Sequence, residues 1–338
     1  MKTSIIHCYF NRLFITVFSL FAIISSSSCN RLHEDLEPCP QGLRIRFIYD
    51  YNMEFANAFY SQVDCLTVLF YDENGNYVMT ETNTTSDLAD ENWRMVVDLA
   101  PGKYHILAYG GMADDKASFE FVTNPATTRY SDIEVRLKPS CLTEPEGTEL
   151  HHLFYGRLDT EVEKTSTTYR EVTVPMMKDT NNLRVLLQQV SGDPIDNADY
   201  EFRITDNNTL FAWDNDLLPV PTVTYYPWAR GNASPGELPD GSDASVAWAE
   251  LSFSRLVTGA SPRFIITHKE TGNNVVDIPL NNYLLLLKSQ AFATMGNQEF
   301  LDRESRWNMI FFLDQKNHWV SISITIKDWT VRINNSEV

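Results

Sequence analysis

The stretch WVSISITIKDWT, residues 319–330, decides the fold class of this chain. From Val320 to Ile326 an apolar residue stands at every second position, with serine and threonine between them. A β-strand places such residues on one face, whereas an α-helix would spread them around its axis. The segment is therefore predicted to be a strand with one buried and one solvent-exposed face.

The same alternation marks residues 43–49 and 133–137, where charged side chains separate most of the apolar ones. Two turn-forming segments, Asp72–Asn76 and Pro101-Gly102, are each flanked by apolar runs, so each predicts a β-hairpin. Further strands are expected at residues 172–176, 183–190, 249–256, 263–268, 275–279 and 308–313.

The alternation is lost at residues 141–150, where proline and acidic residues gather. We place a linker there, between an N-terminal β-sandwich over residues 41–140 and a C-terminal one over residues 151–338. Many short strands favour an all-β fold of two tandem sandwiches over a fold of alternating strands and helices. One short helix is expected at Tyr283–Ala293, with an extension to Leu301, and a loop insertion at Asp206–Ser245.

Residues 1–28 are typical of a signal peptide. Lys2 and Arg12 precede an apolar run from Leu13 to Ile24, and four serines follow. The run has about a dozen residues, and a helix that spans a bilayer needs roughly twenty. We therefore expect export and removal of this segment.

Cys29 follows the serines directly, and the site resembles the lipobox at which bacterial lipoproteins receive acyl chains such as palmitate. It departs from the usual motif because Ser26 stands where an aliphatic residue is expected. The alternative is plain cleavage nearby. Several acyl chains would hold the protein firmly, since one chain binds only marginally. Residues 29–40 would then form a tether, whose acidic cluster resembles a signal for export to the cell exterior.

The charge of the chain argues against nucleic acid as a partner. Loss of Lys2 and Arg12 with the signal peptide takes the net charge from −18 to −20. Such a charge repels the phosphate backbone. The 310 residues that remain after removal of residues 1–28 are enough for two domains with substantial cores.

The cysteines left after processing are Cys39, Cys65 and Cys141. In an oxidising compartment one disulfide is expected. We favour Cys39 with Cys65, because Cys39 precedes the first predicted strand, Cys65 opens the second, and neighbouring strands bring such positions close. Such a bridge would contribute on the order of 3 kcal/mol. The alternative is that all three are buried free thiols.

Seven blocks, in this order and spacing, resemble the FimB/Mfa2 family of fimbrillin-associated anchor lipoproteins of Bacteroides-type fimbriae. They are GLRIRFIYDYNME (42–54), QVDCL (62–66), LAPGKY (99–104), AYGG (108–111), MMKDTNN (176–182), EFLDR (299–303) and NMIFFLD (308–314). The resemblance implies two transthyretin-like Greek-key sandwiches, attachment to the outer membrane through Cys29, and a place at the base of a fimbria. The implied partners are fimbrial shaft or accessory subunits, joined by exchange of β-strands.

Strand exchange has an independent physical basis, because a sandwich that lacks an edge strand offers unpaired backbone groups to a partner's strand. In the family's polymerising subunits a protease removes the leading segment and frees such a groove. Here a cut after Arg44 or Arg46 would destroy the first strand, so we expect an anchor and not a shaft or tip subunit. The segment 331–338 is short for a donor extension, which suits a subunit that ends a polymer and equally suits an ordinary last strand.

Enzymatic motifs are absent from the sequence: it contains no phosphate-binding glycine loop, nucleophile elbow or HExxH. His151 and His152 are adjacent and would point to opposite faces of a strand, so they make a poor metal-binding pair. Asp302, Arg303 and Glu304 are expected to form a solvated charge cluster. We expect no enzyme, no metal and no cofactor beyond the covalent lipid at Cys29.

The strongest rival function is a surface lipoprotein that binds glycans. Trp213, Tyr225, Tyr226 and Trp228 could stack on sugars, since their rings combine an apolar face with a polar edge. The alternative is that these aromatic residues pack inside the second domain.

Overall fold

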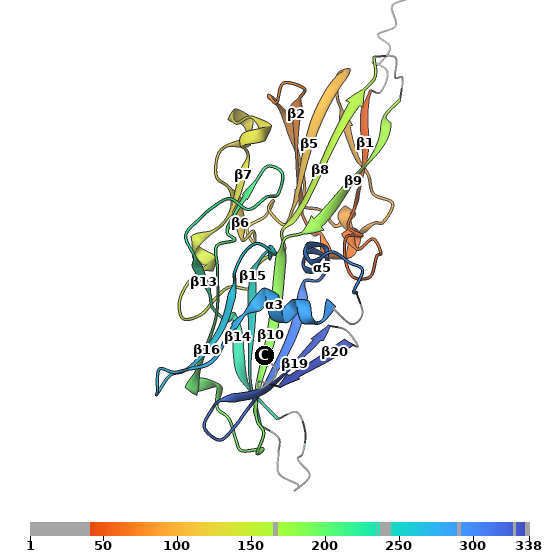
Figure 1. Cartoon of the computed structure of the whole chain (residues 1–338). Helices are drawn as coiled ribbons and strands as arrows, with labels where there is room; N and C mark the ends of the chain where they lie inside the picture. The colour runs from red at the N-terminus through yellow and green to blue at the C-terminus, as the bar shows by residue number, and fades with distance from the viewer. Residues whose placement is uncertain are drawn as a thin grey trace, which may run out of the picture. The chain divides into compact units, whose positions relative to one another are not determined.

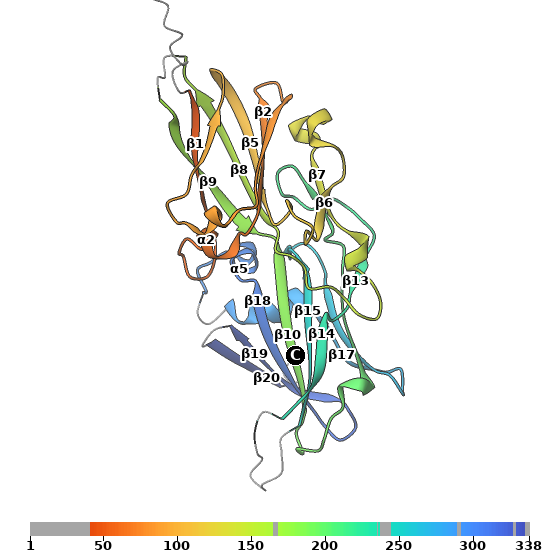
Figure 2. The same ribbon diagram turned by 180° about the vertical axis from the view of Figure 1, so that it is seen from behind.

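The computed structural model describes residues 41–164, 168–234, 236, 245–288, 292–326 and 329–334, and Figures 1 and 2 show it from opposite sides. Gln41–Val338 form one compact unit. Within it the predicted all-β architecture is confirmed, with sheets that pack into two sandwiches. The signal peptide and the tether, with Cys29 and Cys39, lie outside the described residues.

The first sandwich is a single seven-stranded sheet folded on itself. Its strands are β1 (Gly42–Ile48), β2 (Leu66–Asp72), β3 (Tyr77–Asn83), β4 (Met95–Asp98), β5 (Gly102–Gly110), β8 (Phe154–Val162) and β9 (Arg170–Lys178), in the order β3-β2-β5-β8-β9-β1-β4. Residues 170–175 of β9 pair in parallel with β1, and residues 176–178 pair antiparallel with β8. The two halves of the sheet therefore share β9.

β1 packs against β2 and β5 across the first core. Leu43 and Ile45 are fully buried and share a hydrophobic cluster with Ile106 of β5. Gly42 begins β1 with φ +148°, and a Cβ at this position would lie 2.0 Å from the carbonyl oxygen of Val97 on β4. The close pairing of β1 with β4 therefore requires glycine.

The half of the sheet formed by β2 and β5 is buried on both faces. Val68 and Phe70 face the first core, while Leu69 and Tyr71 face a second, larger one. A three-stranded sheet of order β12-β7-β6 contributes to this larger core; its strands are β6 (Phe119–Phe121), β7 (Glu134–Leu137) and β12 (Leu210–Ala212). Burial of both faces explains why residues 68–71 form a continuous apolar run without alternation.

The second sandwich packs a six-stranded sheet of order β14-β15-β10-β18-β19-β20 against a four-stranded sheet of order β13-β11-β16-β17. Its strands are β10 (Thr180–Gln189), β11 (Tyr200–Asp206), β13 (Val223–Tyr225), β14 (Ala229–Ala233), β15 (Val246–Ser254), β16 (Arg263–His268), β17 (Asn274–Pro279), β18 (Arg306–Leu313), β19 (Trp319–Ile326) and β20 (Trp329–Asn334). β10 pairs in parallel with β18, as β1 does with β9.

The strand predicted within residues 319–330 is confirmed as β19. Ile322 and Ile324 are fully buried in the core. Val320 is 38% exposed, because the register between β18 and β19 shifts at this point. Such a bulge turns one side chain out of the regular alternation.

Helices are few and short among the described residues. The α-helices there are α2 (Phe59–Gln62), α3 (Leu280–Leu286) and α5 (Asn297–Arg303), and the 3-10 turns are η1 (Ser86–Ala89), η2 (Pro125–Thr127), η3 (Tyr130–Asp132), η4 (Pro139–Cys141) and η5 (Asn197–Asp199). The helix predicted at 283–293 begins three residues earlier and ends at Leu286. Its extension to Leu301 is wrong, because a separate helix begins at Asn297.

The domain boundary requires a correction. β8 and β9 follow residues 141–150, yet they pair with β5 and β1 and belong to the first sheet. The chain passes to the second sandwich at Asp179, the one residue between β9 and β10 (Figure 1). Loss of alternation at 141–150 thus marks a loop that precedes strands of the first sheet, and the boundary moves to Asp179.

The second predicted hairpin is also wrong. β2 and β3 do pair across the turn at 72–76. β4 pairs with β1, however, while β5 pairs with β2 and β8. Pro101-Gly102 therefore carries the chain from one half of the folded sheet to the other.

Candidate functional site

Four segments meet where β9 gives way to β10, and we call them the junction site: Asp50–Asn52, Lys178–Asn181, Arg255 and Asp302–Arg303. The first segment follows β1, Arg255 follows β15, and Asp302 and Arg303 end α5. Hydrogen bonds from Arg303 to the loop after β1 tie the two sandwiches together, while the Arg255–Asp302 ion pair lies within the second sandwich. Three of the blocks that carry the family resemblance contribute to it.

Asp179 is the most deeply buried charge of the junction site. Its side chain is fully buried, and Oδ1 accepts a hydrogen bond of 2.9 Å from Nδ2 of Asn215. Oδ2 has no hydrogen-bond partner among the described residues. Burial raises the pKa of Asp179 from 3.8 to about 7, because it penalises the charged form.

Burial lowers the pKa values of two basic neighbours of Asp179, whereas it raises that of the acid. Burial lowers the pKa of Lys178 to about 8, with Arg306 adding repulsion. Burial also lowers the pKa of His152 to about 3, and its Nδ1 lies 3.2 Å from Oγ1 of Thr180. Burial thus penalises the charged forms of Asp179, Lys178 and His152 alike.

Asp302 forms a buried ion pair with Arg255. Nε and Nη2 of Arg255 donate to the two carboxylate oxygens at 2.8 and 3.0 Å. Nη1 of Arg255 donates to the backbone oxygen of Asn215, the residue that also binds Asp179. The ion pair and Asp179 thus belong to one network.

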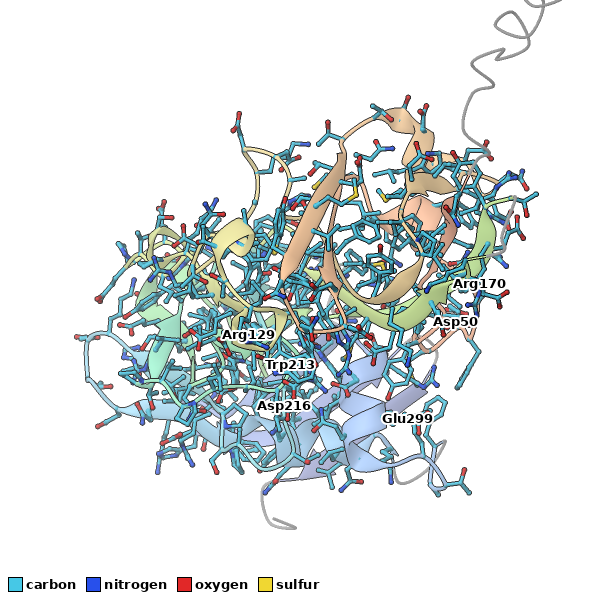
Figure 3. The ribbon with its side chains drawn as sticks, turned by 90° about the horizontal axis from the view of Figure 1, so that it is seen from above. Asp50, Arg129, Arg170, Trp213, Asp216 and Glu299 are labelled. Carbon is cyan, nitrogen blue, oxygen red and sulfur yellow. The ribbon has the colours of Figure 1, made fainter. Side chains whose placement is uncertain are left out.

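Arg303 joins α5 to the loop after β1. Its Nη1 donates to the backbone oxygens of Asp50 and Asn52 at 3.3 and 3.4 Å. The guanidinium also lies 4.2 Å from the ring centroid of Tyr51 and 4.6 Å from that of Phe55, a cation–π geometry. Figure 3 labels Asp50 of this loop together with Glu299 of α5.

The expectation of a solvated cluster at Asp302, Arg303 and Glu304 is therefore wrong. Asp302 is 5% exposed and Glu304 is 7% exposed. Asp302 is paired with Arg255, 47 positions earlier, while Glu304 accepts hydrogen bonds from the backbone N–H groups of Ser305 and Arg306. The charge pattern alone could not show this burial.

The leading and last strands are both in place within their sheets. β1 lies between β4 and β9, so the first sandwich is complete. β20 lies at the edge of the six-stranded sheet and pairs antiparallel with β19. Residues 329–334 thus form a last strand of the second sandwich in this structure.

Cys65 and Cys141 are buried, and neither forms a disulfide with another described residue. Burial raises the pKa of the Cys65 thiol. The bridge predicted between Cys39 and Cys65 stays a prediction, because Cys39 lies outside the described residues. The same holds for lipid at Cys29.

His151 and His152 have different partners, as expected for adjacent residues. Nδ1 of His151 lies 3.1 Å from the backbone oxygen of Gly111, whereas His152 contacts Thr180. Gly111 has φ +83°, and a Cβ there would lie 1.9 Å from the backbone oxygen of His152. Glycine at this position thus allows the chain before β8 to pass close to the end of β5.

The aromatic residues proposed as a sugar platform do not form one exposed surface. Tyr225 is 2% exposed, and its hydroxyl donates to Oδ1 of Asn208. Trp213, labelled in Figure 3, packs edge-on against Tyr130 and beneath the guanidinium of Arg157. Packing inside the protein thus accounts for both residues.

No helix among the described residues has the length and apolar character that crossing a membrane requires. Residues 36–335 match the family model for fimbrillin-A associated anchor proteins Mfa1 and Mfa2. None of the proteins with a curated description matches the chain.

Three solved structures resemble this one over most of its length. A candidate adhesin from Bacteroides thetaiotaomicron is 52% identical with a TM-score of 0.82, and the match covers 88% of this chain and 100% of that one. A candidate polysaccharide-binding protein from the same species is 28% identical with a TM-score of 0.73, covering 88% and 99%. The fimbrial anchor protein Mfa2 from Porphyromonas gingivalis is 18% identical with a TM-score of 0.63, covering 87% and 99%, and shares the fold.

Proposed function

Because this chain belongs to the family of fimbrillin-A associated anchor proteins, we propose that it is fixed to the outer membrane through a lipid on Cys29 and holds the base of a surface fimbria. The family places it among fimbrial proteins of the cell surface. The lipid, the membrane and the manner of joining are the parts of this assignment that we propose.

The observation that carries the proposal is the position of β1. This strand is paired on both sides, and Leu43 and Ile45 are fully buried. Arg44 lies between them, so a cut after it would separate Leu43 from the rest of the strand. Each apolar side chain removed from the core would cost about 1.5–3 kcal/mol. A chain that keeps β1 keeps its link to Cys29, as an anchor must.

The tether is short enough to hold the protein near the membrane. From Cys29 to Gly42 the chain advances by 13 residues, which can span at most about 45 Å when fully extended. A lipid on Cys29 would therefore keep the start of the first sandwich within this distance of the bilayer.

A complete first sandwich also suggests how the anchor joins a fimbrial subunit. Since β1 already fills its place, the first sandwich offers no groove there for a partner's strand. We therefore assign the anchor the role of donor, with β20 as the donated strand. Its edge position supports this role. Among the described strands β20 pairs only with β19, so only that pairing is lost when β20 leaves the sheet.

Intact-mass and peptide mass spectrometry of the protein extracted from its native membrane tests the anchor role. We expect a Cys29 peptide that carries two or three acyl chains and is still joined to residues 42–48. A Cys29→Ala variant should lose the acyl mass and leave the membrane fraction, while its β1 stays intact.

Species that begin past Arg46 would contradict the anchor role. An intact chain with no lipid on Cys29 would contradict only the mode of attachment.

A further inference from the structure

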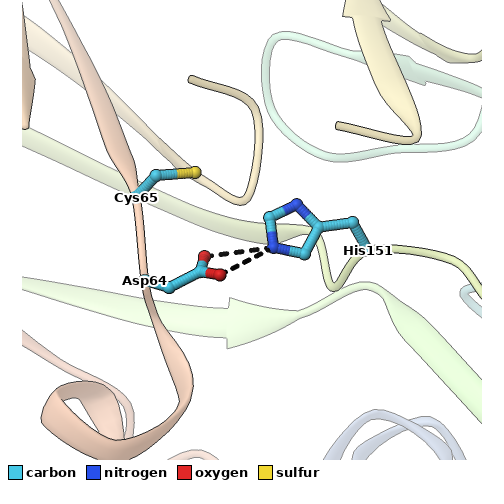
Figure 4. A group of neighbouring side chains, drawn as sticks. All are labelled: Asp64, Cys65 and His151. Atoms are coloured by element: carbon cyan, nitrogen blue, oxygen red, sulfur yellow. Dashed lines mark hydrogen bonds and ion pairs between the residues drawn. The ribbon is translucent and has the colours of Figure 1, made fainter. Parts of the chain in front are cut away.

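Asp64, Cys65 and His151 bring three different metal-ligating groups together at one place (Figure 4). Asp64 and Cys65 immediately precede β2, and His151 lies before β8. The carboxylate, the Sγ atom and an imidazole nitrogen all lie within 4.8 Å of one another. Figure 4 shows the side chains of Asp64 and Cys65 on the side of their strand that faces the His151 ring.

The hydrogen bonds of His151 orient its ring for metal binding. Nδ1 lies 3.1 Å from the carbonyl oxygen of Gly111, which can only accept, so Nδ1 carries a proton. Nε2 lies 3.0 and 3.1 Å from the two oxygens of the Asp64 carboxylate, which also can only accept, so a proton lies between them that a metal ion would replace. A ring held through one nitrogen by a backbone carbonyl, with the other nitrogen turned to a ligand, is the usual arrangement of metal-binding histidine.

The donor set fits zinc best among common divalent ions. Zn²⁺ binds thiolate sulfur, imidazole nitrogen and carboxylate oxygen at about 2.0–2.3 Å, in tetrahedral geometry. Ca²⁺ and Mg²⁺ prefer oxygen ligands alone. Tetrahedral ligands at these distances lie roughly 3.3–3.8 Å apart. The Asp64–His151 contact would therefore open by a few tenths of an ångström, and the sulfur would move closer.

The surroundings allow this adjustment and favour a cation. The Asp64 side chain is 53% exposed and so is free to rotate, while Cys65 is 1% exposed. Asp114 adds a carboxylate at 3.7 Å from Nδ1 of His151. Lys116 is a nearby charge of the opposite sign.

We propose that Asp64, Cys65 and His151 bind one zinc ion, with water in the fourth coordination position. Binding replaces the thiol proton of Cys65, and any proton on Nε2 of His151, and both leave to solvent. The ion would link the start of β2 to the segment before β8, next to the junction site. The inference does not depend on the anchor role.

The test uses the full mature lipoprotein in detergent, reduced and stripped of metal with a chelator. Calorimetric titration with Zn²⁺ should give one ion per chain and release of protons. Titration with Co²⁺ should give a thiolate-to-cobalt charge-transfer band, which reports the sulfur ligand directly. Zn²⁺ should also raise the melting temperature.

Cys65→Ser should abolish the charge-transfer band, and His151→Gln should weaken Zn²⁺ binding by at least about 100-fold. Asp64→Asn alters an exposed side chain, so the variant should fold normally, and it should bind Zn²⁺ more weakly because a ligand is lost. His105→Gln is the matched control, because His105 also contacts a carboxylate, that of Asp159 at 2.7 Å, but belongs to no group with a cysteine among the described residues. This variant should bind Zn²⁺ as the wild type does. Cys141→Ser is the control for the other buried thiol.

Zn²⁺ binding equal in the wild type and in Asp64→Asn would overturn the proposal, as would a Co²⁺ complex without the thiolate band. Thiol counting on the unreduced membrane protein gives an independent check. A disulfide at Cys65 in that protein would remove the ligand and overturn the proposal in the same way.

Discussion

A disulfide that fixes β20 to β19 is expected to abolish the joining of this protein to fimbrial subunits. Ser321 and Asn334 stand opposite each other in the pairing of these strands. With both replaced by cysteine and oxidised, β20 cannot leave its sheet to enter a partner's groove. Co-purification of fimbrial subunits with the anchor should therefore fall to the background level, and a reductant should restore it.

The matched control places a disulfide between two strands that have no role in joining. Glu201 and Thr267 stand opposite each other on β11 and β16. The double cysteine variant at these positions should retain fimbrial subunits with or without the reductant. Full retention by the β19–β20 variant in its oxidised form would exclude β20 as the donated strand, and it would leave attachment through Cys29 untouched.

Asp179→Asn is expected to stabilise the protein above neutral pH but not in acid. The pKa of Asp179 is raised from 3.8 to about 7 in the folded state. Its contribution to stability is thus fully present below pH 4 and is lost as the pH rises to about 7. Three pKa units correspond to a loss on the order of 4 kcal/mol. Asparagine cannot ionise, so it escapes this loss.

The measurement is the free energy of unfolding in denaturant at a series of pH values, for the variant minus the wild type. This difference should rise from pH 4 to pH 7 and then stay constant. The amide of asparagine introduces a buried donor beside the ion pair, which can cost about 1–3 kcal/mol at every pH. The slope with pH, and not the absolute value, is therefore the test.

Taking the difference also removes the effect of His152. Its pKa is lowered to about 3, so its contribution is present above pH 6.5 and is lost as the pH falls. This trend opposes that of Asp179 and partly hides it in the wild type. Asp216→Asn, an exposed change next to Asn215, should alter stability by less than about 0.5 kcal/mol. A pH-independent difference for Asp179→Asn would show that this carboxyl ionises normally.

The elements that sequence could predict are those with a local signal. β1 and β19 follow from a two-residue period that needs no knowledge of neighbouring strands. Which strands pair is a long-range property. β8 and β9 return to the first sheet, and β12 pairs with β7 across more than 70 residues of sequence. No local pattern carries that information, so the sequence predicts a domain boundary that is too early in the chain.

The junction site shows a second limit of prediction from sequence, which concerns buried charges. Asp302 and Asp179 are charged residues that a sequence pattern assigns to the surface, since isolated buried charges are costly. Arg255 and Asn215 make their burial possible, and both come from distant segments. The proposed zinc ligands could not be predicted from the sequence for a similar reason, since Asp64 and His151 are 87 positions apart.

The single residue between β9 and β10 has a mechanical consequence. In the proposed anchor role, a fimbria under flow pulls on its base, and the backbone at Asp179 is the covalent path of that pull from one sandwich to the other, beside the hydrogen bonds of Arg303. β9 and β10 each run parallel to a neighbour, β1 and β18, so tension along the strands shears many backbone hydrogen bonds at once and does not open them one by one. A longer connection would stretch first; here the load reaches both sheets together.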